Sequence, residues 1–247
     1  MPGPDKKESL LKKYKERMMK VLAFDTSTKF LTIACVENNK PEKTYHKDVG
    51  IRHSEILTGK IKDMLDDLNW TMQDLDLICV GSGPGSFTGL RVAMATVKGF
   101  LTVVSAKAVV VPTVDAMAMN VSKSFAVEKK HKLIAPFLDA RKNKIYTCIY
   151  DCFKTDVKLV SGYILSKPED FLKGLKQNLF FFGDGVKKYK KELDSCSFAD
   201  YSEDVDWYPK AVDIARIGLK KSLKKTDSHE NIEPLYLHEK ECNIVNG

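Results

Sequence analysis

Two aspartates at the ends of apolar runs are the first residues of this chain whose placement could support chemistry. Asp25 follows the run Lys20–Phe24, and Asp139 follows the run Leu133–Leu138. Both runs are typical of buried strands, and a carboxylate at such a strand end can serve as a catalytic group. Aspartate also opens tight turns by bonding to its own backbone. The sequence leaves both interpretations open for each aspartate.

A glycine-rich segment, GSGPGSFTGLR over Gly81–Arg91, is the strongest local signal. It has four glycines within nine residues, between an apolar run and a helical pattern. Glycine lets a backbone approach another group closely, and amides at a helix start can hold an anion. The segment is not a dinucleotide fingerprint, because position 86 is serine, and no Gly-Lys-Ser/Thr follows to make a P-loop. A tight strand-to-helix crossover and a ligand contact both remain open.

Metal ligands and nucleophiles have little support. The five histidines, at 46, 53, 131, 229 and 238, form no HxxxH or HExxH pair, and no GxSxG elbow occurs. His53 is expected to begin a helix. The six cysteines form no CxxC pair, which favours free thiols in a reducing cytoplasm; they are Cys35, Cys79, Cys148, Cys152, Cys196 and Cys242.

The elements that would position these residues follow one order twice. In the first half we expect strands at 20–24, 30–36 and, weakly, 42–48, a helix from residue 53 or 54 to about 68, a strand at 75–80, a helix at about 88–104 and a strand at 108–111. In the second half we expect strands at 133–138, 144–150 and 157–165, a helix at 167–176, a strand at 179–182 and a helix that ends near 193. Two such units predict an α/β protein of two related lobes facing each other across a cleft.

Composition indicates an ordinary globular protein of 247 residues, with 43% apolar and 30% charged residues. The most apolar region, Val92–Val111, contains Lys98 and Lys107, so we expect no membrane span, and the N-terminus does not resemble a signal peptide. The net charge is +7, of which +4 lies in residues 1–20, so the argument for direct RNA binding is weak. We expect an extension over 1–18, a first lobe over 19–107 and a second lobe over 108–247.

The two helices of the first half carry more apolar surface than one sheet face needs. The helix at 88–104 is apolar on all sides and has only Arg91 and Lys98 as charged residues, so both of its sides must be covered. The alternatives are a partner protein and the lobe's own helices. The partner interpretation predicts an interface of Leu57, Ile61, Met64, Leu65, Leu68, Leu90, Met94, Val97 and Leu101.

The run Ala23–Thr28 (AFDTST) followed by Gly83–Arg91 (GPGSFTGLR) resembles proteins of the TsaB (YeaZ-type) family. Shorter matches continue in the same order to about residue 240; they are His53-Ser54-Glu55, Pro112-Thr113, Leu138-Asp139-Ala140-Arg141, Gly183-Asp184-Gly185 and Pro234-Leu235-Tyr236-Leu237. The GPGSFTGLR run is specific, whereas each of the others would be weak by itself.

The resemblance implies an actin/Hsp70/sugar-kinase-like fold of two ribonuclease-H-like lobes, and a role in forming threonylcarbamoyladenosine on tRNA. It implies a scaffold subunit without catalysis of its own, which binds the catalytic TsaD through the first-lobe helices; a TsaE-type ATPase joins them. This chain would need no cofactor or metal, while the complex uses ATP and Mg²⁺. Contact with tRNA would be indirect or weak, in the cytoplasm and away from membranes.

Two rival interpretations stay open. The chain could bind or hydrolyse a nucleotide like a sugar kinase, or fit an older glycoprotease label of its relatives; without its partner it could also form a homodimer. The candidate cleft or nucleotide-binding residues are Asp25, Thr26, Ser27, Gly83, Gly85, Asp139 and Gly183.

Overall fold

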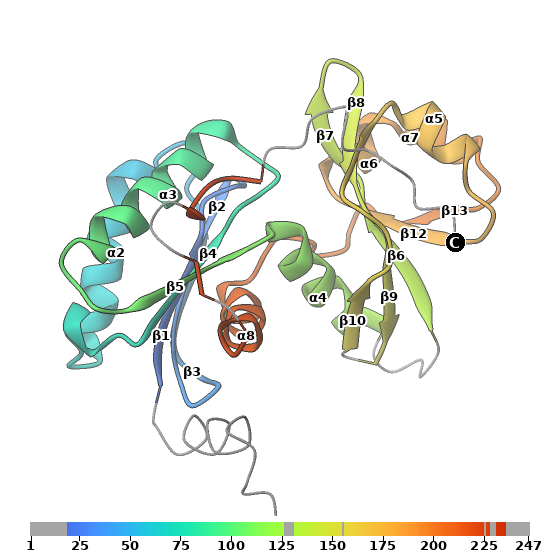
Figure 1. Ribbon diagram of the computed structural model, residues 1–247. Helices are drawn as coiled ribbons and strands as arrows, with labels where there is room; N and C mark the ends of the chain where they lie inside the picture. The colour runs from blue at the N-terminus through green and yellow to red at the C-terminus, as the bar shows by residue number, and fades with distance from the viewer. Residues whose placement is uncertain (1–18, 126–130, 155, 225, 228–230, 236–247) are drawn as a thin grey trace, which may run out of the picture. The chain divides into compact units, whose positions relative to one another are not determined.

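The computed structural model describes residues 19–125, 131–154, 156–224, 226–227 and 231–235 (Figure 1). The expected extension over 1–18 lies outside the described residues. The chain forms two compact units: unit 1 runs up to Val111 and adds Lys210–Pro234, and unit 2 contains Pro112–Pro209 and Leu235. The expected division near residue 107 is therefore corrected, because a late segment of the chain returns to unit 1.

Unit 1 is built on a five-stranded sheet with the order β3-β2-β1-β4-β5. Its strands are β1 (Lys20–Asp25), β2 (Phe30–Glu37), β3 (Lys40–Asp48), β4 (Leu77–Gly81) and β5 (Lys107–Val111). The first three are antiparallel, and β4 and β5 run parallel to β1. All the strands expected for the first half are present.

Helices cover both faces of this sheet. The expected helices α2 (His53–Asp67) and α3 (Phe87–Leu101) lie on one face, and α8 (Ala211–Ser222) lies on the other (Figure 1). Helix α8, which the sequence did not predict, is the segment that returns to unit 1, where it packs on β1, β2 and β5. No helix among the described residues has the length and apolar character needed to cross a bilayer.

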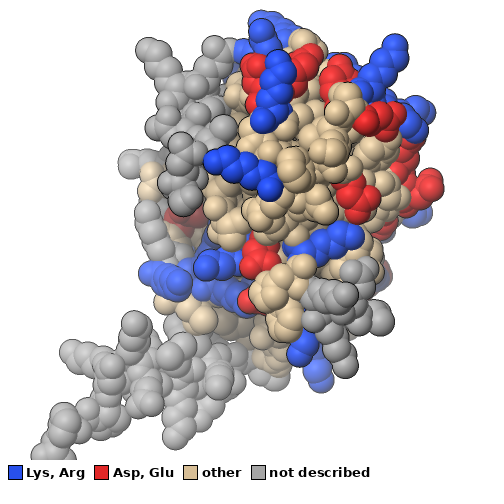
Figure 2. Space-filling model, turned by 90° about the vertical axis from the view of Figure 1, so that its right-hand side faces the viewer, with Lys and Arg blue, Asp and Glu red and all other residues tan. Residues whose placement is uncertain are grey.

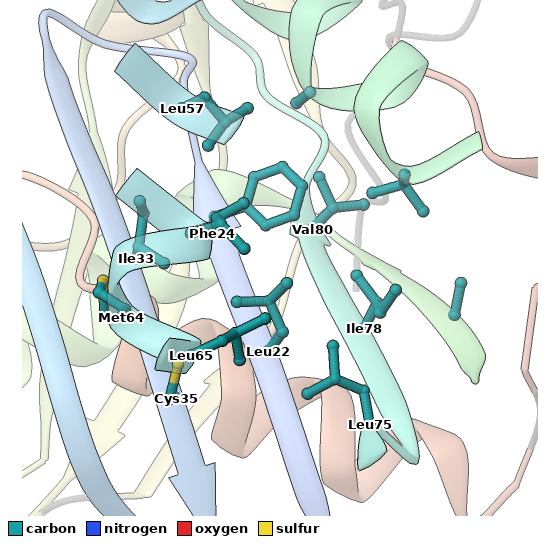
Figure 3. Packing of buried hydrophobic residues seen from close by; sticks show 14 of the residues in the cluster. Leu22, Phe24, Ile33, Cys35, Leu57, Met64, Leu65, Leu75, Ile78 and Val80 are labelled. Carbon is teal, nitrogen blue, oxygen red and sulfur yellow. The ribbon is translucent and has the colours of Figure 1, made fainter. Parts of the chain in front are cut away.

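Buried aliphatic and aromatic side chains of β1, β2, β4 and α2 make the core under α2 and α3. Figure 3 shows Leu22 and Phe24 of β1 between Ile33 of β2 and Val80 of β4, with Leu57 of α2 beside them. All five are fully buried. The face of the sheet under α2 and α3 is therefore packed from within unit 1.

Unit 2 repeats the strand order of unit 1. Its main sheet, β10-β9-β6-β12-β13, is again the third, second, first, fourth and fifth strand in chain order, and a small sheet β11-β8-β7 adjoins it. The strands are β6 (Lys132–Pro136), β7 (Leu138–Arg141), β8 (Lys144–Thr147), β9 (Tyr150–Phe153), β10 (Asp156–Leu159), β11 (Ile164–Ser166), β12 (Leu179–Phe182) and β13 (Ala199–Tyr201). The common order supports the prediction of two related lobes.

Three strands expected in the second half are each broken in two. The amide of Phe137 donates to Phe182 O (2.7 Å) and the amide of Ile149 donates to Ser161 Oγ (2.8 Å), so neither amide joins a continuous hairpin ladder. The last expected helix is likewise divided, into α6 (Asp184–Lys188) and α7 (Lys190–Asp194).

The other helices of unit 2 are α4 (Thr113–Phe125), which the sequence did not predict, and α5 (Pro168–Lys173), with proline in its first turn as expected. Helix α4 packs on β6, β9 and β10. On the face drawn in Figure 2, basic and acidic side chains lie side by side along the upper and right-hand edges, and the middle is mostly uncharged.

Contact between α8 and the sheet depends on Gly218. A Cβ atom at this position would lie 2.2 Å from Sγ of Cys79, which is fully buried in β4. We predict that Gly218→Ala lowers the free energy of unfolding by about 1–3 kcal/mol, because the overpacked helix must shift. Gly59→Ala in α2 is the control: its Cβ would meet no atom within 4 Å, so better helix propensity should raise stability by up to about 1 kcal/mol. Denaturant unfolding followed by circular dichroism checks both; an unchanged Gly218→Ala midpoint would contradict this packing.

Candidate partner-binding surface and the glycine loop

Helices α2 and α3 turn their apolar stripes toward their own sheet. In α2 the buried side chains include Leu57, Ile61, Met64 and Leu65, at most 3% exposed, and Figure 3 shows three of them directed at the core. In α3 the buried positions are Gly89, Leu90, Ala93, Met94 and Val97. Their spacing is that of one helical face, so burial in unit 1 accounts for the stripe.

The predicted interface residues therefore need correction. Seven of the nine are at most 5% exposed and belong to unit 1's interior; they are Leu57, Ile61, Met64, Leu65, Leu90, Met94 and Val97. Only Leu68 and Leu101 are partly exposed. The physical reason is that α2 and α3 alone cover this face of the sheet, so their larger apolar side chains are needed there.

Apolar surface nevertheless remains on the outer side of the helix pair. The partly buried residues there include Ile56, Leu68, Met72, Val92, Phe100, Leu101 and Val104. Between the two helices lies a groove of about 410 Å³. Its lining residues are Thr58, Ile61, Lys62, Leu65, Asp66, Trp70, Thr71, Met72 and Phe100. The sequence signal for this groove was Trp70 and Met72, two large apolar residues just beyond the end of α2.

The glycine loop packs tightly on the turn between β1 and β2. The Ser86 amide donates to Ser27 O (2.7 Å), and Thr26 Oγ1 donates to Gly89 O (2.7 Å). A Cβ on Gly85 would lie 2.4 Å from Ser27 O, and one on Gly89 would lie 2.0 Å from Thr26 O. Only glycine fits at these two positions, so the crossover interpretation accounts for both.

Other residues of the loop also have local structural roles. Gly83 has φ +94°, a left-handed conformation that favours glycine, and its peptide bond to Pro84 is cis. Ser86 is the N-cap of α3 and accepts a hydrogen bond from the Gly89 amide (3.2 Å). Phe87, 54% exposed, and Arg91, whose guanidinium lies 3.9 Å from the Phe87 ring centroid, face solvent instead. Packing within unit 1 does not explain these last two.

Asp25, Thr26 and Ser27 are buried and point into this packing. Asp25 accepts hydrogen bonds from the amide and the hydroxyl of Ser27, both at 2.7 Å. All three residues are at most 2% exposed. Their polar atoms hold the turn and the glycine loop together, which agrees with the turn-forming interpretation of Asp25 and leaves little for a nucleotide to contact.

Unit 2 repeats this arrangement at Asp139 and Gly183. The Gly185 amide donates to Phe137 O (2.8 Å), and a Cβ on Gly183, whose φ is +120°, would lie 2.9 Å from the same oxygen. Asp139 accepts hydrogen bonds from Lys188 Nζ (2.8 Å) and the Arg141 amide (3.0 Å). Asp139 and Gly183 thus come together in unit 2, and Asp25, Thr26, Ser27, Gly83 and Gly85 come together in unit 1.

The charge environment fixes the ionisation of Asp139. Burial opposes ionisation, but the hydrogen bonds from Lys188 and the Arg141 amide, with the charges of Lys188 and Arg141, outweigh it and hold the pKa of Asp139 below its ordinary value. Nearby, burial raises the pKa of Asp184, whose Oδ1 accepts a hydrogen bond from the Asp139 amide (2.9 Å). The cations beside Asp139 are thus engaged by a carboxylate that stays ionised at neutral pH.

The five described cysteines are unpaired, as expected for free thiols, and Cys242 lies outside the described residues. Four of them are buried. Burial raises the pKa of the Cys35 thiol to about 11 and that of Cys152 to about 12. Such thiols are poor nucleophiles at neutral pH.

The paired units with a shared strand order place the chain among actin/Hsp70/sugar-kinase-like proteins. The structure of YeaZ from Pseudomonas aeruginosa has this fold: it matches with a TM-score of 0.74 and 23% identity, covering 89% of this chain and 100% of that one. Residues 35–244 match the family model of TsaD, tRNA N6-adenosine threonylcarbamoyltransferase.

Curated relatives narrow the assignment. The tRNA threonylcarbamoyladenosine biosynthesis protein TsaB of Bacillus subtilis is 30% identical over 71% of this chain and 76% of its own length. TsaB of Haemophilus influenzae is 26% identical over 88% of this chain and 92% of its own. The chain belongs to the TsaB (YeaZ-type) family and is a protein of tRNA threonylcarbamoyladenosine biosynthesis.

The ion pairs of Asp139 make a prediction for acid stability. Its pKa is lowered in the folded state, so its stabilising contribution is present above the unfolded-state pKa of about 3.9 and is lost as pH falls through the folded-state value. We predict that Asp139→Asn lowers the free energy of unfolding by about 1 kcal/mol at pH 7, after allowance for solvent screening, and by much less near pH 3.

Asp204→Asn is the matched control for charge, because Asp204 is an exposed residue of the same unit. Urea unfolding of both variants from pH 7 to pH 3 measures the difference. A loss of stability for Asp139→Asn that stays constant over this range would contradict the assigned electrostatic role.

Proposed function

We propose that this TsaB-family chain is a non-catalytic subunit that binds a TsaD-type catalytic subunit through the outer surface of α2 and α3. The observation that carries the proposal is the α2–α3 groove, whose floor of Ile61, Leu65 and Trp70 is apolar and whose Phe100 and Met72 are only partly buried. A concave apolar surface between two helices suits a helix of another protein, which inserts side chains at helical spacing.

The polar residues support a scaffold more than an enzyme. Asp25 spends its printed hydrogen bonds on the β1–β2 turn, and Asp139 is held by Lys188 and Arg141. Glycines 85 and 89 fit against backbone of their own unit. We therefore assign ATP and Mg²⁺ to the complex rather than to this chain, and include a TsaE-type ATPase among its partners.

We place the complex in the cytoplasm, where its tRNA substrate is found. Most of the chain's net charge lies in its first 20 residues, +4 of +7, which gives the remainder little general attraction for a phosphate backbone. Indirect or weak contact of this subunit with tRNA follows from that distribution.

A charged side chain in the groove should prevent binding. Phe100→Asp places a carboxylate at a partly buried position that lines the groove. We expect the affinity for the catalytic subunit to fall about 30-fold or more, as when an interface hot spot of at least 2 kcal/mol is lost, and tRNA modification by the reconstituted complex to fall with it. Ile61 and Met94 are unsuitable for this test, because they are 1% and 5% exposed and a charge there would unfold unit 1.

Phe198→Asp is the matched control, since Phe198 is a 37% exposed phenylalanine of unit 2. Isothermal titration with the catalytic subunit, with circular dichroism as a folding check, gives the affinities. Unchanged binding by folded Phe100→Asp would refute the assigned surface.

The enzyme alternative makes a different prediction. We expect the purified chain to turn over no ATP above the buffer rate, and ATP use to begin only when the other subunits are added. The measurement is phosphate release before and after their addition. ATP turnover by the isolated chain that is abolished in Asp139→Asn would instead favour an intrinsic activity.

A further inference from the structure

The described chain begins beside the α2–α3 groove. The Lys20 amide, at the start of β1, donates to Asp76 Oδ2 (3.0 Å), and Lys20 Nζ lies 4.9 Å from the ring centroid of Trp70. The same ammonium is 4.0 Å from Asp74. Trp70, Thr71 and Met72 form one end of the groove lining. The residues that precede Lys20 therefore leave unit 1 next to this groove.

The groove has the character of a surface that needs a cover. Ile61 is 1%, Leu65 3% and Trp70 9% exposed, so what water contacts there is chiefly the partly buried Met72 and Phe100 with the edges of this floor. Four aspartates stand close to its rim, Asp63, Asp66, Asp67 and Asp74, with side chains 41–65% exposed. Each has a lysine within 4.0 Å, so apolar contact must supply most of any binding.

The sequence of the preceding segment fits this surface. In residues 9–18, SLLKKYKERM, the apolar side chains are Leu10, Leu11, Tyr14 and Met18. Positions i, i+1, i+4 and i+8 lie on one side of a helix, and Ser9 is a preferred N-cap residue. Residues 1–18 carry six Lys/Arg and three Asp/Glu. A helix placed there would bring one apolar stripe and an excess of cations to an apolar groove near carboxylates and the negative end of α2.

We propose that the N-terminal segment, residues 9–18, docks its apolar stripe in the α2–α3 groove of its own chain when no partner is bound. The attachment at Lys20 makes this an intramolecular event with a high effective concentration, so few side chains suffice. Because the groove is also the proposed partner surface, the segment competes with the catalytic subunit; this second part rests on the proposed function. Docking by itself does not.

The test compares two variants of the full chain that lower its net charge by the same two units. Leu11→Asp/Tyr14→Asp disrupts the stripe, whereas Lys12→Gln/Lys13→Gln changes positions outside it. Hydrogen exchange is measured over residues 57–72 without partner, and affinity for the catalytic subunit is measured by titration. We expect faster exchange and about tenfold tighter partner binding for Leu11→Asp/Tyr14→Asp only, as when a segment that occupies the groove nine-tenths of the time is removed.

Three results would overturn the proposal. Exchange over residues 57–72 that is the same in both variants would show that the segment does not cover the groove. Faster exchange without tighter partner binding would exclude competition. A dimer in light scattering that persists in both variants would make a second copy the cover. In each case Phe100→Asp still tests the partner surface by itself, so failure of this inference is distinguishable from failure of the proposed function.

Discussion

The sheet of unit 1 must bury both of its faces, and only three helices are available to cover them. With α8 on one face, α2 and α3 must cover the other, and that requirement takes up the apolar stripes of both. What α2 and α3 offer to another protein is therefore limited to their outer sides and to the groove between them. The surface for recognition is thus small and defined by a few residues, of which Phe100, Met72 and Trp70 are the largest.

The same economy of space explains the glycine loop. Gly85 and Gly89 sit so close to the β1–β2 turn that a side chain at either would overlap backbone oxygen. In unit 2, Gly183 and Gly185 make the equivalent approach to Phe137. A related pair of lobes thus uses the same contact twice, and in both places the glycines hold a strand end against a neighbouring turn. The contact is a structural requirement of each unit, so these glycines by themselves give no argument for nucleotide binding.

The sequence predicted most of this fold, and its failures have physical causes. Strong periodicity located α2 and α3 to within a few residues, because large apolar side chains recur at helical spacing there. Helix α4 has the same signal, with Val114, Met117, Ala118 and Val121 buried, and could have been found. Helix α8 was obscured because Asp213 and Gly218 occupy buried positions of its inner face.

The interface prediction failed for a different reason. Periodicity measures how much apolar surface a helix has, not whether its own sheet or another protein covers it. Likewise, nothing local in the sequence indicates that residues 210–234 rejoin unit 1, since that pairing is made by contacts distant along the chain. The glycine motif was located correctly, but its close approaches to Thr26 and Ser27 became evident only in three dimensions.

A subunit that works by association must keep its binding surface accessible yet remain soluble when alone. The α2–α3 groove meets the first requirement with a floor that is almost fully buried, so only a narrow apolar strip meets water. The second requirement is met more easily if the strip has a weak, local cover that a partner can displace. A tethered segment of modest apolar content satisfies this balance better than a tightly packed helix, because its affinity is set by attachment rather than by contact area. The position of Lys20 beside Trp70 supplies that attachment at the edge of the groove itself.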